Sequence, residues 1–342
     1  MQEFILGGYT KHANDGLYKI DFDAKTAEFT NKTLIAKLEN PTYVCLDESK
    51  TYLFAINTKA EGKAGIVAFK KDAEGEFKKV DEIYPFSNAA CHLSFREQSK
   101  TIYAANYHLG QIEVYSFKNE RLSHIQTIEQ SGRSIHPNQD SSHIHFVGFN
   151  NYETLLFAAD LGADTVSTYD VDRAGYLSLA SVAELPAGTG PRHLVLSKDE
   201  KFMFVNGELN STTNVFSVSR TGQLKLLDTY LNIPKEEVSH AASAAIRLSS
   251  DDRFLYVSSR YFNKISVFKV DRNEGKLERI QVIDAFGKVP RDFNFDYTEN
   301  YLLVAHRDSP KLVVFNRDKQ SGKLSLNNRD ARADECVCIA QA

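Results

Sequence analysis

The sequence is poor in the features that mark membrane and nucleic-acid-binding proteins. No run approaches the roughly 20 apolar residues that a membrane helix needs, so we expect no membrane partner. The net charge of −4 argues against a dedicated binder of nucleic acid or of anionic membranes. Tryptophan is absent, and the 8 prolines and 18 glycines are few among 342 residues. What remains is the composition of an ordinary globular chain.

Cysteine is also scarce, and several catalytic motifs are missing. The four cysteines form no CxxC pair and no dense framework, so we expect free, buried thiols and a cytoplasmic protein. Residues 1–8 have no basic region and no long apolar core, and we expect no secretory signal. There is no GxSxG elbow, no glycine-rich phosphate loop and no HExxH. We expect neither a cofactor nor a bound metal.

One short apolar phrase recurs along the whole chain. It occurs at Phe4–Gly8, Leu53–Asn57, Ile102–Asn106, Leu156–Asp160, Met203–Gly207, Leu255–Ser259 and Leu302–His306. Successive copies begin 49, 49, 54, 47, 52 and 47 residues apart. A period near 50 is typical of propeller blades, whereas helical solenoids have shorter repeats.

The rest of each repeat also has the pattern of strands. An alternating segment such as Ile265–Phe268 follows the phrase, and a glycine turn such as Gly275 leads into a fourth strand. A further strand begins about eleven residues before the phrase, for example at Arg192 in repeat five. Each repeat therefore supplies one blade. We predict an all-β fold, a single seven-bladed β-propeller domain over residues 1–342 with four-stranded antiparallel blades.

The two ends of the chain complete each other. Repeat one has no residues left for its first strand, while Glu335–Ala340 is an unpaired strand-like run after the last repeat. We predict that this C-terminal segment supplies the missing strand of blade one. That pairing closes the ring and removes two open edges.

Polar side chains gather where the two inner strands of each blade meet. In an antiparallel hairpin the start of the first strand lies beside the end of the second, so these positions from all blades line one mouth of the central channel. The first strands start at Thr42, Cys91, His145, Arg192, Ala244 and Arg291, and the second strands are followed by Tyr9, Thr58, Tyr107, Leu161, Glu208, Arg260 and Arg307.

These two rows contain a histidine, four arginines and a glutamate. Arginine is rarely buried unpaired, and its guanidinium matches carboxylate and phosphate, so the rows predict an anionic ligand. Two alternatives remain open. The charged residues could pair among themselves, as Arg192 with Glu208, and His143 and His145 could be histidines with satisfied hydrogen bonds. His136, Asp140, His143 and His145 also lie close enough in sequence to consider a metal site, although the stretch is expected to be a loop running into a strand.

Several motifs in this order resemble the bacterial lactonase family of seven-bladed propellers. They are Ser142–His145, Asp160–Asp164, Gly190–His193, Asn206–Asn210, Phe254–Arg260 and Pro290–Phe293. The resemblance covers essentially the whole chain. The type activity of that family is 6-phosphogluconolactonase, and fungal carboxy-cis,cis-muconate cyclase has the same fold.

The resemblance implies a site of one histidine, two arginines and a glutamate at the channel mouth. Matched by motif, these are His145, Arg192, Glu208 and Arg260, all four of which the hairpin rows contain. The sequence departs from the family pattern at Ser259, at Gly207 between Asn206 and Glu208, and at His306-Arg307. As substrate-binding residues we predict His143, His193, Arg291, Arg307, Tyr107 and Asp160.

The hypothesis that follows is hydrolysis of 6-phospho-glucono-1,5-lactone, a step of the pentose phosphate pathway. In it Arg260 and Arg291 hold the phosphate with Arg307 as a further contact, and Arg192 stabilises the oxyanion. The general base is Glu208 or His145, a choice that the sequence leaves open. One alternative is a carboxymuconate-type lactone reaction on the same site. Another is a non-catalytic propeller that binds a metabolite or a protein on its rim. No protein partner is implied.

Overall fold

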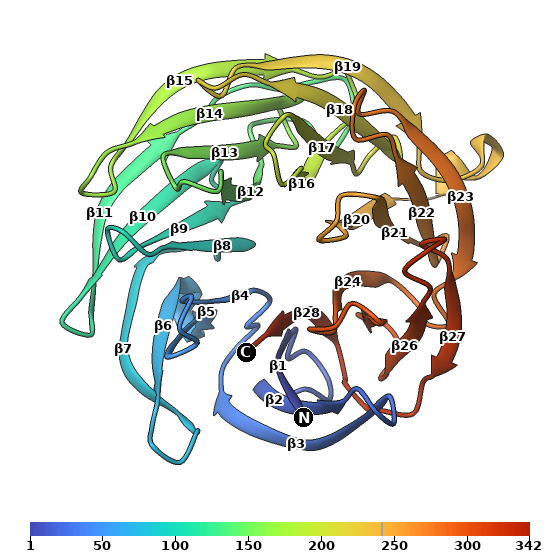
Figure 1. Cartoon of the computed structure of the whole chain (residues 1–342). Helices are drawn as coiled ribbons and strands as arrows, with labels where there is room; N and C mark the ends of the chain where they lie inside the picture. The colour runs from blue at the N-terminus through green and yellow to red at the C-terminus, as the bar shows by residue number, and fades with distance from the viewer. Residues whose placement is uncertain (241) are drawn as a thin grey trace.

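The chain forms a closed ring of seven β-sheets around a central channel. A computed structural model describes residues 1–240 and 242–342, and these contain seven four-stranded sheets (Figure 1). Every neighbouring pair of strands within a sheet is antiparallel; for example, β16 pairs with β17 and β17 with β18. The predicted all-β, seven-bladed propeller with four-stranded antiparallel blades is confirmed.

In each of the first four blades, the first-named strand lies at the channel and the last-named strand lies at the outer edge. Blade one consists of β28 (Cys336–Gln341), β1 (Gln2–Gly8), β2 (Gly16–Asp23) and β3 (Glu28–Lys37). Blade two consists of β4 (Val44–Leu46), β5 (Tyr52–Lys59), β6 (Lys63–Lys71) and β7 (Phe77–Phe86). Blade three consists of β8 (His92–Arg96), β9 (Thr101–Asn106), β10 (Gln111–Lys118) and β11 (Arg121–Glu129). Blade four consists of β12 (Ile144–Phe149), β13 (Leu155–Asp160), β14 (Thr165–Val171) and β15 (Leu177–Glu184).

The remaining three blades follow the same order. Blade five consists of β16 (Pro191–Leu196), β17 (Phe202–Gly207), β18 (Thr212–Val218) and β19 (Leu224–Leu231). Blade six consists of β20 (Ala242–Leu248), β21 (Phe254–Arg260), β22 (Lys264–Val270) and β23 (Leu277–Asp284). Blade seven consists of β24 (Pro290–Phe295), β25 (Tyr301–His306), β26 (Leu312–Arg317) and β27 (Leu324–Asn328). The described helical segments are two short 3₁₀ turns, η1 (Ala60–Gly62) and η2 (Lys235–His240).

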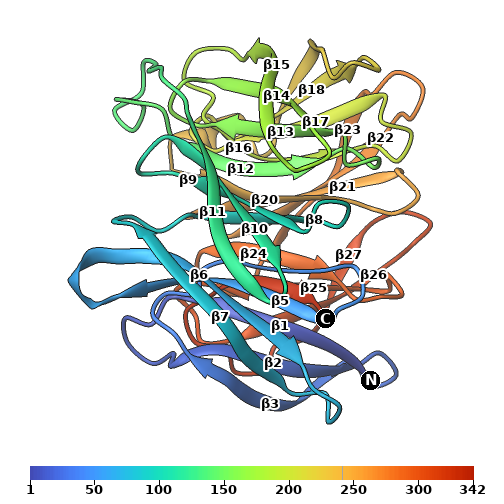
Figure 2. The same ribbon diagram turned by 90° about the vertical axis from the view of Figure 1, so that its left-hand side faces the viewer.

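The burial of each strand explains its sequence pattern. The recurring apolar phrase is the second strand of each blade, and in β9, β13 and β17 every residue is buried. Both faces of such a strand are covered by neighbouring blades, so the sequence is continuously apolar. Outer strands such as β15 are exposed on most positions. Figure 2 looks onto this outer edge, where β7 and β11 run along the front.

The core is divided among the seven junctions between neighbouring blades. Each of the seven hydrophobic clusters combines side chains of two adjacent blades, such as Phe254 of blade six with Phe293 of blade seven. Glycine turns fit into these junctions. Gly322 has a φ of +74°, and a Cβ at this position would collide with the Phe254 ring of the preceding blade. The repeated glycine therefore allows close packing as well as the turn.

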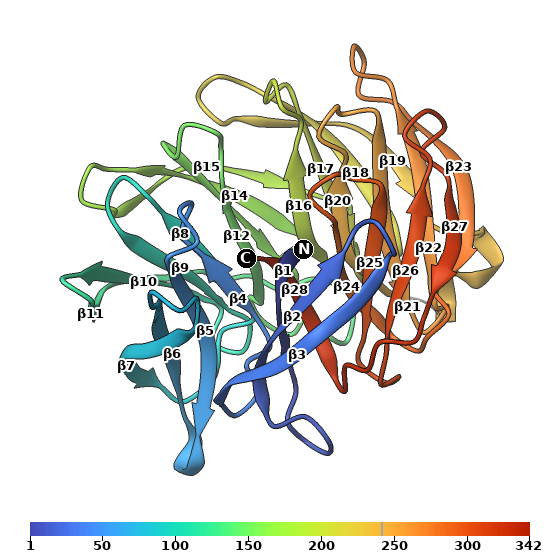
Figure 3. The same cartoon turned by 60° about the horizontal axis from the view of Figure 1, so that its bottom comes forward.

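The C-terminal strand closes the ring. β28 pairs with β1 in the register Leu6↔Ile339, and the two chain ends lie close together (Figure 3). Asp292 of blade seven also accepts a hydrogen bond from the Ile339 backbone N–H at 3.0 Å, which ties β28 to the last blade. The predicted closure is confirmed. None of the helical segments among the described residues has the length and apolar character to cross a membrane.

Candidate active site

The inner hairpins bring polar residues of all seven blades to one mouth of the channel. In blade five, Pro191 pairs with Gly207, which sets Arg192 close to Glu208 as the hairpin argument predicted. A cavity of about 460 Å³ occupies this mouth. Its lining includes nine residues of the two predicted rows: Tyr9, Thr42, Thr58, Cys91, Tyr107, His145, Glu208, Arg260 and Arg291. Arg192, Leu161, Ala244 and Arg307 are not among the residues that line it.

Glu208 lies between two arginines. Its Oε1 is 2.6 Å from Nη2 of Arg260, and its Oε2 is 2.9 Å from Nε of Arg192. Burial alone would raise the pKa of Glu208, but the charges of Arg260, Arg192 and Arg291 outweigh burial and hold this pKa below the usual value. The carboxylate is therefore ionised at neutral pH, and both of its oxygens face a guanidinium.

Arg192 lies behind Glu208 and is 3% exposed. Its Nη1 donates to the Ala244 carbonyl at 2.7 Å and lies 3.2 Å from Nε2 of His193. The Nε hydrogen is not aimed at Glu208, so that contact is an ion pair without a hydrogen bond. Burial and the charge of Arg291 lower the pKa of Arg192 to about 10, which still leaves it charged at neutral pH. In this geometry Arg192 reaches the cavity only through Glu208.

His145 is a neutral imidazole on the cavity wall. Burial lowers its pKa well below the usual value, and the charges of Arg192 and Arg291 lower it further. Its buried Nδ1 has no hydrogen-bond partner among the described residues. The His145 ring packs between Tyr107, at 5.8 Å, and His193, at 5.3 Å between ring centroids. A buried ring nitrogen without a partner favours a hydrogen bond to a bound group, and a neutral imidazole has one nitrogen that can accept a proton.

Arg291 is the guanidinium of the mouth that has no acidic partner within the described part of the chain. Its Cζ lies 5.8 Å from the centroid of the Tyr9 ring, a cation–π distance. A partly buried arginine without an anion favours a negatively charged ligand. Of the two alternatives considered from sequence, mutual pairing therefore describes Arg192, Glu208 and Arg260 but leaves Arg291 available.

Two of the predicted substrate contacts, Asp160 and His143, instead make hydrogen bonds within the protein near the mouth. Asp160 is fully buried, and its Oδ1 accepts hydrogen bonds from the backbone N–H groups of His143, Gly162 and Ala163. It fixes a loop and does not line the cavity. His143 stacks on Tyr107 with ring centroids 4.3 Å apart, and its ring nitrogens contact the Tyr107 carbonyl and Asp140. This matches the alternative of a histidine with satisfied hydrogen bonds.

Two other predicted contacts lie outside the cavity lining. His193 sits behind Arg192 and packs against His92 with ring centroids 5.4 Å apart. Arg307 makes a two-point ion pair with the adjacent Asp308, at 2.6 and 2.8 Å. It lines a separate cavity between blades seven and one. Tyr107 is the member of this group that does line the mouth.

The loops add mouth residues that the strand positions did not predict. Lys11 follows Tyr9 by two residues, and Asn40, His108 and residues 87–90 come from other connections. In the sequence, these residues are marked only by lying a few positions from the ends of the inner strands. Cys91 was in the predicted rows, but burial raises the pKa of its thiol to about 12, so it is protonated and is a poor nucleophile.

The residues considered for metal binding do not converge. His143 and Asp140 pair with each other, while Nδ1 of His136 accepts the Asn138 backbone N–H. Within residues 1–240 and 242–342, no group of three metal-binding side chains is close enough to share an ion. All four cysteines are free.

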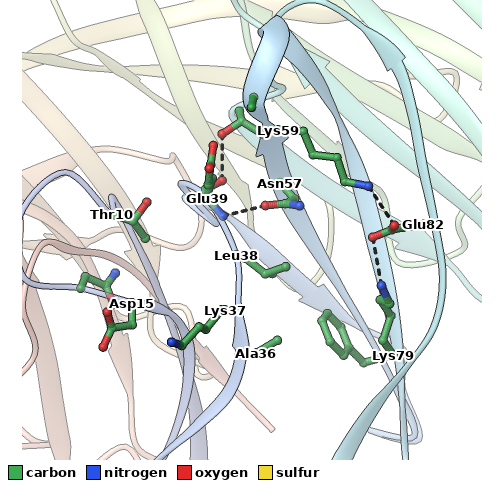
Figure 4. Close-up of a pocket in the computed structure, with 14 residues that line it drawn as sticks. Thr10, Asp15, Ala36, Lys37, Leu38, Glu39, Asn57, Lys59, Lys79 and Glu82 are labelled. Carbon is green, nitrogen blue, oxygen red and sulfur yellow. Dashed lines mark hydrogen bonds and ion pairs between the residues drawn. The ribbon is translucent and has the colours of Figure 1, made fainter.

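A second cavity, of about 740 Å³, opens between blades one and two (Figure 4). It is larger than the mouth cavity, but two of its lysines, Lys59 and Lys79, both pair with Glu82. Its described lining contains neither an arginine nor a histidine. We therefore assign the candidate active site to the channel mouth.

Comparison with known proteins agrees with this architecture. A sequence model of the family "Lactonase, 7-bladed beta-propeller" matches residues 3–341. The chain belongs to this lactonase family. It is 30% identical to a protein of Bacillus subtilis named 6-phosphogluconolactonase, over 98% of this chain and 96% of that protein.

Solved structures of similar proteins have the same fold. A protein from Lactobacillus plantarum is 35% identical with a TM-score of 0.95, over 99% of this chain and 98% of that chain. The periplasmic gluconolactonase of Pseudomonas aeruginosa is 26% identical with a TM-score of 0.92, over 99% and 98%. The family supports a lactonase, a hydrolase that opens a lactone ring. The names of the Bacillus subtilis and Pseudomonas aeruginosa proteins differ in whether the sugar carries a phosphate.

Proposed function

We propose that this lactonase hydrolyses a sugar lactone with an anionic group, foremost 6-phospho-glucono-1,5-lactone, as a step of the pentose phosphate pathway in the cytoplasm. The observation that carries the proposal is the mouth cavity, which is lined by the Glu208–Arg260 pair, by neutral His145 and by Arg291, an arginine without an acidic partner among the described residues. A substrate with a fixed negative charge fits such a wall. The free cysteines are compatible with a reducing compartment.

In the proposed reaction, water adds to the lactone carbonyl and the ring oxygen then leaves. Charge develops on the carbonyl oxygen, and Arg260 lines the cavity whereas Arg192 does not. We therefore give the oxyanion contact to Arg260. Arg192 would act through Glu208, since it pairs with that carboxylate from behind. This differs from the role that the sequence suggested for Arg192.

For the general base we favour His145 over Glu208. Both carboxylate oxygens of Glu208 face arginines, and its lowered pKa makes it a weak base. His145 is neutral and its Nδ1 is unoccupied among the described residues. In the proposal, His145 takes the proton from water and returns it to the leaving ring oxygen. Glu208 holds Arg260 in place against the carbonyl.

Two other functions remain as alternatives. A lactone of a dicarboxylic acid, as in the carboxymuconate reaction, is favoured by the same unpaired Arg291, since a guanidinium accommodates a carboxylate as well as a phosphate. A purely binding propeller would be expected to have its rim arginines fully paired, and Arg291 does not fit that expectation.

The proposal is tested by following loss of anionic lactones with purified protein in a pH-stat, with the spontaneous rate subtracted. We expect acceleration of 6-phospho-glucono-1,5-lactone opening above that of a muconolactone. Arg260→Ala removes the proposed oxyanion contact and Glu208→Gln removes the carboxylate that holds Arg260, so each should lower kcat by on the order of a hundredfold. Glu82→Gln makes the same carboxylate change in the cavity between blades one and two and should retain wild-type kcat.

No acceleration of any anionic lactone would contradict the proposed function and favour the binding alternative. Faster opening of the muconolactone would favour the dicarboxylate reaction. Wild-type rates in both mouth variants would contradict the assignment of the site to the mouth.

A further inference from the structure

The loop between β1 and β2 brings a second unpaired cation to the mouth. Tyr9 and Lys11 both line the mouth cavity, and both also line the adjoining cavity between blades seven and one. Nζ of Lys11 lies 5.2 Å from the centroid of the Tyr9 ring, and Cζ of Arg291 lies 5.8 Å from the same centroid. Neither cation has an acidic partner within residues 1–240 and 242–342. Two positive charges from blades one and seven thus share one aromatic ring.

The backbone of this loop is fixed by a carboxylate from the other end of the chain. Oε1 of Glu335 accepts the Lys11 N–H at 3.2 Å, while Oε2 accepts the N–H groups of His12 and Ala13 at 2.9 and 3.1 Å. The Glu335 carbonyl also accepts the Tyr9 N–H at 3.1 Å. Because the backbone is held before any ligand arrives, little loop ordering is needed on binding.

Positive charge is confined to one side of the mouth. Arg260, Arg291 and Lys11 come from blades six, seven and one, which are consecutive in the ring. The sector from blade two and the start of blade three is neutral and is lined by Asn40, Thr42, Thr58, residues 87–90 and Cys91. A ligand with an uncharged ring and one charged end would therefore bind in a defined orientation.

Arg307 is already neutralised, although the sequence suggested it for this role. Its guanidinium makes two hydrogen bonds to Asp308, at 2.6 and 2.8 Å, and unlike Lys11 it is not among the residues that line the mouth cavity. Displacing Asp308 would leave that carboxylate without its partner. Lys11 and Arg291 need no such exchange.

We propose that Lys11 and Arg291, arranged around Tyr9, form the subsite for the distal dianionic group of the substrate, a phosphate monoester. The proposal rests on the proposed function, since it names the part of the same mouth that distinguishes a phosphorylated lactone from its unphosphorylated analogue. A phosphate monoester carries close to two negative charges at neutral pH. Two unpaired cations match that charge, and a monocarboxylate would use only one of them.

The subsite is tested with two substrates that differ only in the phosphate. The variants are Lys11→Gln and Arg291→Gln, and the control is Lys25→Gln, an exposed lysine in the β2–β3 turn on the opposite face of the ring. For 6-phospho-glucono-1,5-lactone we expect each subsite variant to lose at least about tenfold in kcat/KM, mainly through KM. The loss for glucono-1,5-lactone should be about tenfold smaller. Lys25→Gln should change neither ratio.

Equal losses on both lactones, or no loss on the phosphorylated one, would overturn the subsite. A binding measurement separates this result from failure of the proposed function. Calorimetry with 6-phosphogluconate and gluconate requires no turnover, and Lys11→Gln should weaken binding of the phosphorylated acid by about tenfold relative to Lys25→Gln. If wild-type protein opens neither lactone but Lys11→Gln still weakens binding of 6-phosphogluconate relative to Lys25→Gln, the subsite is supported and the lactonase proposal is contradicted. If it binds 6-phosphogluconate no better than gluconate, the subsite is wrong.

Discussion

At the scale of single residues, Glu208 and His145 differ in whether the atoms that could accept a proton already have partners. Glu208 is ionised and contacts Arg192 and Arg260, whereas His145 is neutral and has an unoccupied Nδ1 within the described structure. At neutral pH one residue is therefore charged and the other uncharged beside the same cavity. Their pKa directions therefore lead to different dependence of rate on pH.

The pH profile of kcat/KM tests the assignment of His145 as the base. Because its pKa is well below the usual imidazole value, the neutral form persists as the pH falls through about 6.5. We expect a constant rate from pH 8 to below 6.5 and an acid limb at lower pH. His145→Gln should lose on the order of a hundredfold in rate and lose that limb. Circular dichroism at each pH checks that the protein stays folded.

An acid limb near or above the usual imidazole pKa would contradict the inferred environment of His145. A limb that persists in His145→Gln but disappears in Glu208→Gln would make Glu208 the base. These two outcomes separate the candidates that the sequence left open.

Strand pairing predicts which residues lie at the mouth more reliably than it predicts what each of them does there. Nine residues of the hairpin rows line the mouth, because the register of an antiparallel pair fixes which positions are neighbours. The burial of Arg192 behind Glu208 and the pairing of Arg307 with Asp308 depend on side-chain conformations. No periodic pattern contains that information, and the same holds for Lys11, which lies in a loop.

At the scale of strands and turns, β10 carries an unusual buried acid. Glu113 is 2% exposed and accepts hydrogen bonds from Nδ2 of Asn106 and from the Tyr115 hydroxyl, both at 2.7 Å. Burial raises its pKa to about 7. Asn106, the last residue of β9, also donates to the carbonyl of Asn88, a residue of the mouth lining, so Glu113 is linked through Asn106 to the loop before β8.

The buried acid should make stability depend on pH. The unfolded chain ionises Glu113 near the usual value, while the folded chain retains its proton up to about 7. Its contribution is therefore complete at low pH and is lost as the pH rises through about 7. Between pH 5 and 8 we expect Glu113→Gln to gain about 2–3 kcal/mol in the free energy of unfolding relative to wild type. Urea denaturation at the two pH values measures the difference.

The matched control for that measurement is Glu184→Gln, on the exposed edge of β15. This variant should follow the wild-type pH dependence. Parallel curves for wild type and Glu113→Gln would mean that Glu113 is ionised in the folded protein at pH 5 as well as at pH 8.

At the scale of the whole molecule, the ring depends on a strand drawn from the far end of the chain. β28 pairs with β1 and contacts blade seven through Asp292, so blades one and seven are joined by one segment. The sequence allowed this closure to be predicted because repeat one lacked a strand and the C-terminal run was in excess. Counting repeats is reliable for such a fold since every blade has the same strand order.

Ile339 tests how far the closing strand stabilises the entire ring. It is 1% exposed and packs in the cluster shared by blades one and seven. Ile339→Ala should lower the free energy of unfolding by about 2–5 kcal/mol, through lost burial and the cavity left behind. Ile135→Ala, at a side chain that is 77% exposed, should stay within about 0.5 kcal/mol. Urea denaturation followed by circular dichroism compares the two.

If the ring is one cooperative unit, both variants should unfold in a single transition detected equally by far-ultraviolet and near-ultraviolet circular dichroism. A separate early transition in Ile339→Ala would mean that blade one melts alone and that closure stabilises only its own blade.

The closing strand also sets an order of events during synthesis on the ribosome. β1 emerges among the first strands and β28 is the last strand in chain order, so blade one must wait with its inner edge unpaired while the other blades are made. An unpaired edge is a template for pairing with other chains. The inner edge of β1 therefore stays unpaired until β28 has been made.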